Sequence, residues 1–217
     1  AYEALIRSQL ATLKNPEMIL RIAREENKLE DVERICIFKS TETFDQLRKN
    51  KLVKEDALLF INSIASVSLN DEDRERFHRY FSHIQSQIVV EVTEEENMSE
   101  EALIRKRETK GFSGMFALDD YGSGYNTEIN LLNLNPKYIK IDLTIVRDID
   151  KDFDKQQLVS NIVEYAHQKD AYIIAEGIET KEELLKVLEL GVDYLQGYYL
   201  SYPQSNPQEV SDEAIQT

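Results

Sequence analysis

The chain has few of the residues that build disulfide scaffolds, tight turns or glycine-rich loops. Among its 217 residues there are one cysteine, four prolines, seven glycines and no tryptophan. A single cysteine cannot form an internal disulfide, and Cys36, in the run ERICIF, is interpreted as part of the buried face of a helix without a redox role. No glycine-rich turn follows the first apolar run, which argues against a dinucleotide-binding fold of the doubly wound kind.

Long apolar runs and an excess of positive charge are also missing. No apolar run approaches the roughly 18 residues that a membrane span needs, and no charged-then-apolar stretch resembles a secretory leader. We therefore expect a cytoplasmic domain without membrane contact. The net charge of −15 argues against DNA or RNA as a partner, because phosphates would be repelled. A phosphate substrate would therefore need a metal ion.

Apolar segments and helical segments alternate along the whole chain. The apolar segments predict strands near residues 2–6, 57–62, 87–92, 114–119, 137–142, 171–176 and 193–200. Helical spacing is found after Asn15–Pro16, in the segment 71–84 and in the segment 155–169. This alternation is typical of a parallel sheet covered by helices, either a closed barrel or an open doubly wound sheet. With 41% hydrophobic residues, residues 1–217 are long enough for a single domain with one core.

Most of the expected strands end on a polar side chain that can bind a metal ion or phosphate. These residues are Glu3, Asn62, Glu91, Asp119, Lys140, Glu176 and Gln196. In a parallel barrel all strands end at the same face, so residues far apart in the sequence would meet in one acidic pocket. Polar residues on nearly every strand end favour the barrel over the open sheet. Such a rim would bind divalent metal.

The densest motif is Asp119-Asp120-Tyr121-Gly122-Ser123-Gly124-Tyr125, directly after the apolar run MFAL. Adjacent carboxylates at a strand end can bridge two divalent cations, and the glycines allow a sharp turn. The alternative is a plain turn whose aspartate caps the next helix. His78, His83 and His167 are scattered on helical segments, so a histidine-based zinc or iron site is not expected.

The same pieces, in the same order, resemble the EAL-domain phosphodiesterases, which hydrolyse the bacterial messenger cyclic di-GMP. The matching segments are Glu3-Ala4-Leu5-Ile6-Arg7, Asn62, Glu91-Val92-Thr93-Glu94, Asp119 to Tyr125, Ile139-Lys140-Ile141-Asp142, Ala175-Glu176-Gly177-Ile178-Glu179-Thr180 and Gln196-Gly197-Tyr198. The segment Glu101-Ala102-Leu103-Ile104-Arg105 repeats the family's signature, but it follows a helix-capping Ser99 and is interpreted as a surface helix.

The resemblance implies an α/β fold, a modified TIM-like (β/α) barrel with one antiparallel strand. Because the chain opens at Ala1-Tyr2-Glu3, the strand that usually precedes the signature is missing, and residues 1–217 are interpreted as one N-terminally truncated EAL-type domain. The family context implies a homodimer and a larger signalling protein with sensory or cyclase domains upstream.

The resemblance also implies a role for each site residue. Metal ligands are expected at Glu3, Asn62, Glu91, Asp119, Asp120 and Glu176. Catalytic roles are expected for Glu176, Lys140 and Asp120, with Glu176 as general base or water-positioning group. Substrate contacts are expected from Arg7, Glu179 and Gln196. Glu94 is expected to anchor the loop of residues 119–125.

The implied reaction is hydrolysis of cyclic di-GMP to linear pGpG with Mg²⁺ or Mn²⁺, two ions in all, and with Ca²⁺ as an inhibitor. The alternative is a catalytically silent relative that serves as a cyclic di-GMP receptor or a protein-interaction module. Departures from the family pattern include Ser8 in place of tryptophan and Ile64 in place of serine, but none removes an expected metal ligand.

Overall fold

The computed structural model describes residues 1–8, 10, 15–64, 66–93, 115–123, 127–207 and 209–216, without the side chains of residues 93 and 127–130. These residues form two compact units. The first consists of residues 1–92 with Met115, and the second consists of Thr93 with residues 116–216. The single domain expected for residues 1–217 stays a prediction.

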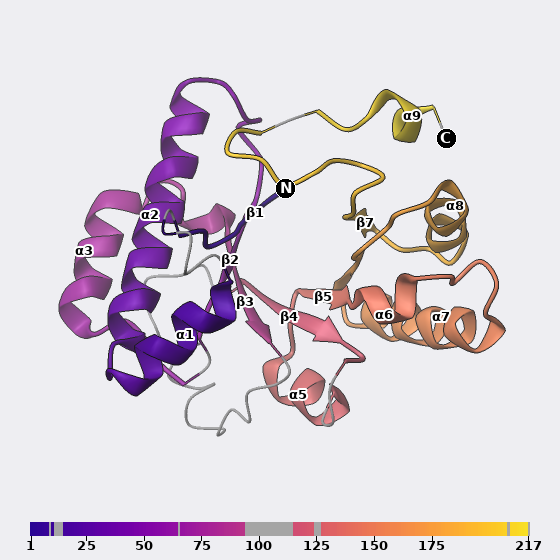
Figure 1. The fold of residues 1–217 in the computed structure, drawn as a ribbon, viewed down its shortest axis with the longest axis horizontal. Coiled ribbons are helices and arrows are strands. Elements are labelled where there is room, and N and C mark those ends of the chain that lie inside the picture. Colours follow the sequence, from indigo (N-terminus) through magenta and orange to yellow (C-terminus); the bar gives the residue numbers. More distant parts are fainter. Residues whose placement is uncertain are drawn as a thin grey trace. The chain divides into compact units, whose positions relative to one another are not determined.

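The first unit is a parallel three-stranded sheet with helices between its strands (Figure 1). Strand β1 (Tyr2–Ala4) pairs with β2 (Leu59–Asn62), which pairs with β3 (Ile88–Thr93). Helices α1 (Pro16–Glu25) and α2 (Leu29–Lys49) connect the first two strands, and α3 (Asp71–Phe81) and the short 3₁₀ helix η2 (Gln85–Gln87) connect the next two. Helix α1 begins where the sequence predicts, because the Asn15 side chain accepts a hydrogen bond from the Glu17 amide and Pro16 occupies the first turn.

Helices α2 and α3 bury an aromatic and aliphatic core against β2. Phe44 and Phe77 are buried with Ile61, and Phe38 meets Phe77 edge to face with ring centroids 5.6 Å apart. Full burial of a side chain of this size contributes roughly 1.5–3 kcal/mol. This core fixes the end of β2, where Asn62 lies.

The second unit is a parallel four-stranded sheet. Strand β4 (Met115–Tyr121) pairs with β5 (Tyr138–Ile141), β5 with β6 (Tyr172–Ala175), and β6 with β7 (Tyr194–Leu195). The connecting helices are α5 (Thr127–Leu134), α6 (Leu143–Val146), α7 (Phe153–Gln168) and α8 (Lys181–Glu189), and α9 (Asp212–Ile215) follows the last strand.

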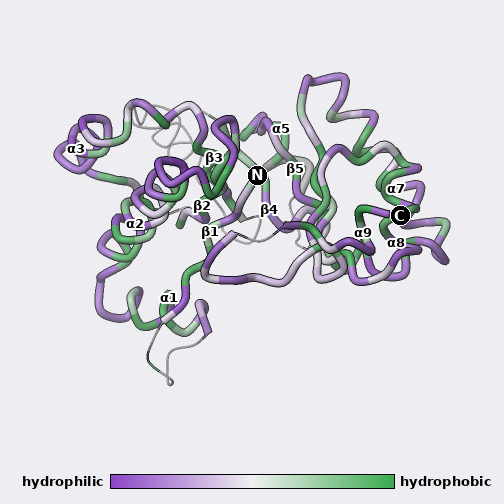
Figure 2. The backbone as a smooth tube through the Cα atoms, turned by 90° about the horizontal axis from the view of Figure 1, so that it is seen from above, coloured by the Kyte–Doolittle hydropathy of each residue, from purple (hydrophilic) through white to green (hydrophobic). Residues whose placement is uncertain are grey.

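Hydrophobic and hydrophilic residues alternate along α2 and α7 (Figure 2), as expected for helices that cover a sheet. Val159 and Ala166 of α7 are fully buried, as are Ile139 of β5 and Ile173 of β6. The strands between these helices are therefore nearly continuous apolar runs, which is typical of parallel sheets.

The predicted strands are confirmed at all seven positions. Five of them are shorter than predicted, β3 has the predicted length with its bounds shifted by one residue, and β4 extends two residues further, to Tyr121. Every strand pairing that the structure describes joins consecutive strands in parallel, which is the connectivity of a TIM-like (β/α) barrel. The antiparallel strand that the family resemblance implies is not among these described strands. The expected helix after Ser99, with the repeat at residues 101–105, lies outside the described residues.

Candidate metal centre

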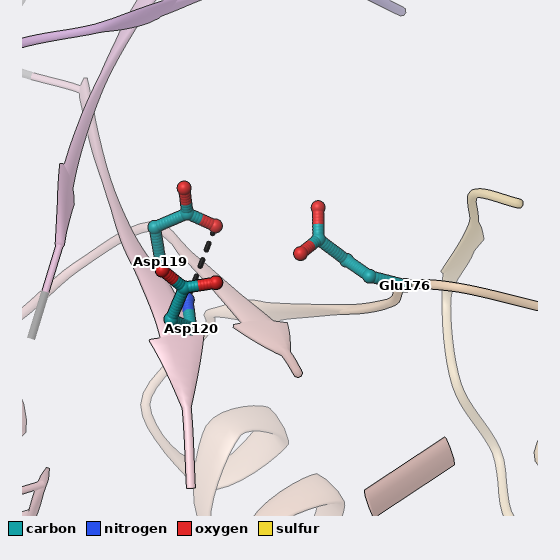
Figure 3. A group of neighbouring side chains, drawn as sticks. All are labelled: Asp119, Asp120 and Glu176. Atoms are coloured by element: carbon teal, nitrogen blue, oxygen red, sulfur yellow. Dashed lines mark hydrogen bonds between the residues drawn. The ribbon is translucent and has the colours of Figure 1, made fainter. Parts of the chain in front are cut away.

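Three carboxylates meet at the carboxyl-terminal ends of β4 and β6 in the second unit (Figure 3). One oxygen from each of Asp119, Asp120 and Glu176 lies within 4.8 Å of the other two. Asp119 and Asp120 belong to β4, and Glu176 follows the last residue of β6. The sequence predicts this grouping, and the structure brings these three predicted residues together.

A β-bulge explains how two adjacent aspartates turn toward the same partner. Consecutive side chains of a regular strand point to opposite faces. Between β4 and β5, however, Leu118 lies opposite Ile139 and Tyr121 lies opposite Ile141, so β4 has one more residue than β5 at this point. Asp120 occupies the left-handed backbone region, with φ of 56°. The extra residue redirects its carboxylate, which a regular strand would point away from Asp119.

Lys140 joins the cluster from β5. Its Nζ lies 2.9 Å from Asp119 Oδ1 and 2.8 Å from Glu176 Oε1, and its side chain is only 3% exposed. A buried ammonium group is stable only when paired, and here two carboxylates share it. Lys140 therefore reduces the negative potential of the cluster while it fixes two of the three carboxylates.

The first unit carries the other expected metal ligands at or near the carboxyl-terminal ends of its own strands. Asn62 Nδ2 donates to Glu3 Oε1 at 3.0 Å, and Asn62 lies opposite Glu91 in the parallel register of β2 and β3. Glu91 is 1% exposed. Glu3, Asn62 and Glu91 thus lie on three neighbouring strands, as predicted. Their joining with Asp119 into one ligand set stays a prediction.

The expected substrate-contacting residues are solvent-exposed. Arg7 follows β1 and donates to the Ile6 carbonyl oxygen, Glu179 forms an ion pair with Arg147 at 3.1 Å, and Gln196 follows β7 directly. Exposed polar groups are available to a ligand. Their role in binding stays a prediction, and Glu94, the expected loop anchor, lies outside the described residues.

The donor set of the second unit fits hard divalent cations. All three groups offer carboxylate oxygens, which are the ligands that Mg²⁺, Mn²⁺ and Ca²⁺ prefer. The histidines lie elsewhere, as predicted: His83 contacts Asp45 and His167 contacts Asp193, both on partly exposed surfaces.

Two buried glutamates that were not predicted from the sequence hold the loops that follow expected ligands. Glu33 of α2 accepts hydrogen bonds from the Ser63 hydroxyl and the Ile64 amide, directly after Asn62. Glu183 of α8 accepts from the amides of Asp148, Glu179 and Thr180 at 2.9–3.0 Å. Only the capping pattern of Thr180 with Glu183 could have pointed to one of them.

Hydrogen bonding lowers the pKa of Glu183. Burial by itself raises the pKa of this carboxyl, but the three amides and the Thr180 hydroxyl outweigh burial and lower the pKa below its ordinary value. Glu183 is therefore a charged group held inside the protein, 4% exposed, beside the loop that carries Glu176 and Glu179.

Parallel β/α connectivity with a carboxylate cluster at the strand ends is typical of α/β proteins of the barrel class that bind a metal ion at this face. A family model described as the EAL domain matches residues 1–203. The chain belongs to the EAL-domain family.

Named relatives and solved structures agree with this membership. The chain is 34% identical over 120 residues to the cyclic di-GMP phosphodiesterase PdeF of Escherichia coli K12, an alignment that covers 54% of this chain and 16% of PdeF. The chain thus spans a small part of that relative.

Three solved structures, of two proteins, have the same fold. The EAL enzyme Bd1971, in its cAMP- and cyclic di-GMP-bound form, is 28% identical with a TM-score of 0.75, covering 93% of this chain and 57% of that chain. Klebsiella pneumoniae BlrP1, solved as a calcium and cyclic di-GMP complex, is 26% identical with a TM-score of 0.75, covering 96% and 52%. BlrP1 was also solved with manganese and cyclic di-GMP, at 27% identity and a TM-score of 0.73, covering 93% and 51%.

No helix within the described part of the chain has the length and apolar character that crossing a membrane requires.

Proposed function

We propose that this domain hydrolyses cyclic di-GMP to linear pGpG with the help of divalent metal ions, as a cyclic-guanylate-specific phosphodiesterase. The observation that carries the proposal is the grouping of Asp119, Asp120 and Glu176 within 4.8 Å around the buried Lys140. The similarity to PdeF and the cyclic di-GMP complexes of Bd1971 and BlrP1 support the choice of substrate.

Each unit would contribute metal ligands from the ends of its strands. Glu3, Asn62 and Glu91 would be ligands in the first unit, and Asp119, Asp120 and Glu176 would be ligands in the second. Two bound Mg²⁺ or Mn²⁺ ions supply charge neutralisation at the phosphodiester and activation of a water molecule.

Glu176 and Lys140 would control the proton and the charge at the attacking water. Glu176 is 15% exposed, so its carboxylate can reach a solvent molecule and accept a proton from it. Lys140 holds Glu176 Oε1 and Asp119 Oδ1 at fixed separation, and its positive charge would stabilise the negative charge that develops during in-line displacement.

Arg7, Glu179 and Gln196 would hold the substrate. The guanidinium of Arg7 can form forked contacts with a phosphate or a guanine edge, and it is exposed in the structure. Glu179 and Gln196 would line the pocket wall in the second unit. Glu94 would anchor the loop of residues 119–125, and a homodimer together with upstream signalling domains would set when that loop is ordered.

A receptor that binds cyclic di-GMP without hydrolysis is the second candidate function. The observation that favours it is the pairing of Lys140 with two of the three carboxylates, because this pairing reduces the charge available for a cation. In an active enzyme, the negative charge of the three carboxylates must hold a divalent cation despite the positive charge of Lys140.

Product analysis with defined metal ions tests the proposal. The chain is incubated with cyclic di-GMP and Mg²⁺ or Mn²⁺, and pGpG is quantified by chromatography. We expect pGpG with either ion, none with a chelator, and inhibition by Ca²⁺, which is larger and less exacting in coordination geometry. Binding of cyclic di-GMP without any pGpG would identify the receptor instead.

A further inference from the structure

Helix α6 lies against both loops that carry the carboxylates of the second unit. A Cβ atom placed on Gly122, after Asp119 and Asp120, would lie 2.1 Å from Ile145 Cδ1. A Cβ atom placed on Gly177, after Glu176, would lie 2.4 Å from Leu143 Cβ. Both glycines have positive φ, 99° and 70°, so each loop turns tightly against a side chain of the same four-residue helix.

The start of α6 is tied to the same two strands. The Asp142 amide donates to the Tyr121 carbonyl oxygen at 3.2 Å, and the Asp142 side chain caps the helix by accepting from the Thr144 amide at 2.9 Å. The Glu176 amide donates to the Ile141 carbonyl oxygen at 3.1 Å. The backbone directly after Lys140 is therefore bonded to the ends of β4 and β6.

The far end of α6 is held by two charged side chains from neighbouring helices. Lys155 of α7 donates from Nζ to the carbonyl oxygens of Thr144 and Arg147, both at 2.7 Å. A cation at these carbonyl oxygens is favourable, since the last carbonyl groups of a helix lack intrahelical partners.

Glu183 of α8 connects this end of α6 with the Glu176 loop. Its Oε1 accepts from the Asp148 amide at 2.9 Å, and its Oε2 accepts from the amides of Glu179 and Thr180 at 2.9 and 3.0 Å. The bond from Thr180 belongs to an ordinary capping box of α8. The bond from Asp148 has no part in capping α8, and it joins two loops across the site.

We propose that Lys155 and Glu183 are positioning residues, which hold α6 as a common support for the loops bearing Asp119, Asp120 and Glu176. Neither side chain is assigned a contact with the substrate. Both act through α6, since a shift of this helix would move Gly122 and Gly177 together and with them the separation of the three carboxylates. The consequence for metal binding rests on the proposed function, whereas the coupling of the loops does not.

Hydrogen exchange measured without metal tests the coupling of the loops. We expect Lys155→Met and Glu183→Gln to speed exchange in residues 119–123 and 176–180, because local protection follows local stability. Glutamine retains only one acceptor oxygen, so it can serve Asp148 or the Glu179 and Thr180 amides, but not both. Lys155→Arg should restore protection, because arginine can donate to the same carbonyl oxygens.

Thr180→Ala is the matched control. It removes the hydroxyl that accepts from the Glu183 amide at 3.2 Å and weakens the cap of α8, but it leaves the link to Asp148. Its faster exchange should be confined to the first turn of α8. Unchanged exchange at residues 119–123 in both Lys155→Met and Glu183→Gln would overturn the proposal, as would equal effects of Thr180→Ala and Glu183→Gln on those residues.

Mn²⁺ titration then tests the consequence for the metal centre. Loss of an outer support of a metal site typically costs about tenfold to a hundredfold in metal affinity, and we expect losses of this size for Lys155→Met and Glu183→Gln. Thr180→Ala and Lys155→Arg should bind Mn²⁺ like the unmodified chain. Failure of the unmodified chain to bind Mn²⁺ would refute the proposed function, while the exchange experiment would still decide whether α6 couples the loops.

Discussion

At the residue scale, Asp119 and Glu176 share a lysine but differ in what their loss should do. Asp119→Ala should abolish hydrolysis through lost metal binding, because Asp119 is the expected common ligand of two ions. Glu176→Gln should keep substrate binding while turnover falls by roughly a hundredfold to ten-thousandfold, as for a removed general base.

Steady-state kinetics and cyclic di-GMP binding check this difference. Glu189→Gln is the matched control, because Glu189 is an exposed acid at the end of α8, paired only with Lys186 in the part of the chain that the structure describes. It should leave both measurements unchanged. Native turnover in Glu176→Gln would remove Glu176 as the base.

Cys36 provides a second test at the residue scale. The sequence predicts a buried helix face, whereas the structure shows Cys36 on α2 with intermediate exposure. Burial raises the pKa of its thiol to about 11, with a further contribution from Glu33. Because the ordinary value is 9.0, the thiolate fraction at neutral pH is smaller by roughly a hundredfold.

We therefore expect slow alkylation of Cys36 in the folded protein and fast alkylation in denaturant. The rate of reaction with iodoacetamide, followed by mass spectrometry, measures this difference. Equal alkylation rates in the two states would contradict the raised pKa and would show that Cys36 is reactive in the folded protein.

At the scale of elements, the loop after Asp120 depends on the absence of a side chain at Gly122. Gly122→Ala places a methyl group 2.1 Å from Ile145 Cδ1 at a φ of 99°, so α6 or the loop must move. Gly191 also has positive φ, 85°, but a Cβ atom there would lie at an ordinary 3.5 Å from Val163 Cγ1. Gly191→Ala thus shares the backbone strain, about 1–3 kcal/mol, without the steric clash.

Measurements of thermal unfolding and of metal affinity in the two variants distinguish the effect of backbone strain from the effect of the steric clash with Ile145. Both should lower the unfolding midpoint, and Gly122→Ala should lower it more and also weaken Mn²⁺ binding. The double variant Gly122→Ala with Ile145→Ala should recover part of the metal affinity, because the shortened side chain leaves room for the methyl group. Equal Mn²⁺ affinity in the two single variants would show that the fit of Gly122 against Ile145 is unimportant.

The elements themselves could be predicted from the sequence, and the way they meet could not. Apolar runs located all seven described strands, and Asn15 with Pro16 located the start of α1, because these signals are local. The bulge at Asp120 escaped prediction because it is a mismatch in length between β4 and β5, visible only when the strands are paired. The contacts of Glu33 with Ser63 and Ile64, and the contact of Glu183 with Asp148, escaped prediction because these partners lie 30 or more residues away.

At the scale of the molecule, two charged networks make stability depend on pH. In Asp45, burial raises the pKa, but hydrogen bonds from Lys49 and His83 outweigh burial and lower it below the ordinary 3.8. The pKa of Glu183 likewise lies below the ordinary 4.5. A carboxyl whose pKa is lower in the folded state stabilises the fold above its unfolded pKa and loses that contribution as pH falls through its folded pKa.

We therefore expect the thermal unfolding midpoint to fall as pH drops below about 4.5, the region where the unfolded carboxyls begin to take up protons. Glu183→Gln should flatten this dependence, because glutamine does not titrate. Midpoints measured by circular dichroism between about pH 3 and pH 7 decide the matter. An unfolding midpoint that rises on acidification would contradict the lowered pKa values.

The family and its fold followed from the ordered motifs, whereas the function of this member depends on how its carboxylates and Lys140 share charge. Asp119, Asp120 and Glu176 are close enough for a cation, and Lys140 contacts two of them. An enzyme requires that the negative charge of the three carboxylates hold a divalent cation despite the positive charge of Lys140, whereas a receptor does not. The motifs alone do not distinguish the two cases, because both would contain the same residues.

The most direct test is a single-turnover reaction with the chain in excess over cyclic di-GMP and Mn²⁺ present, with pGpG and bound substrate quantified together. An enzyme converts all bound cyclic di-GMP to pGpG, and Glu176→Gln retains the cyclic form on the protein. We expect this pair of results. Quantitative binding of intact cyclic di-GMP by the unmodified chain, with no pGpG at any Mn²⁺ concentration, would contradict the proposed hydrolysis.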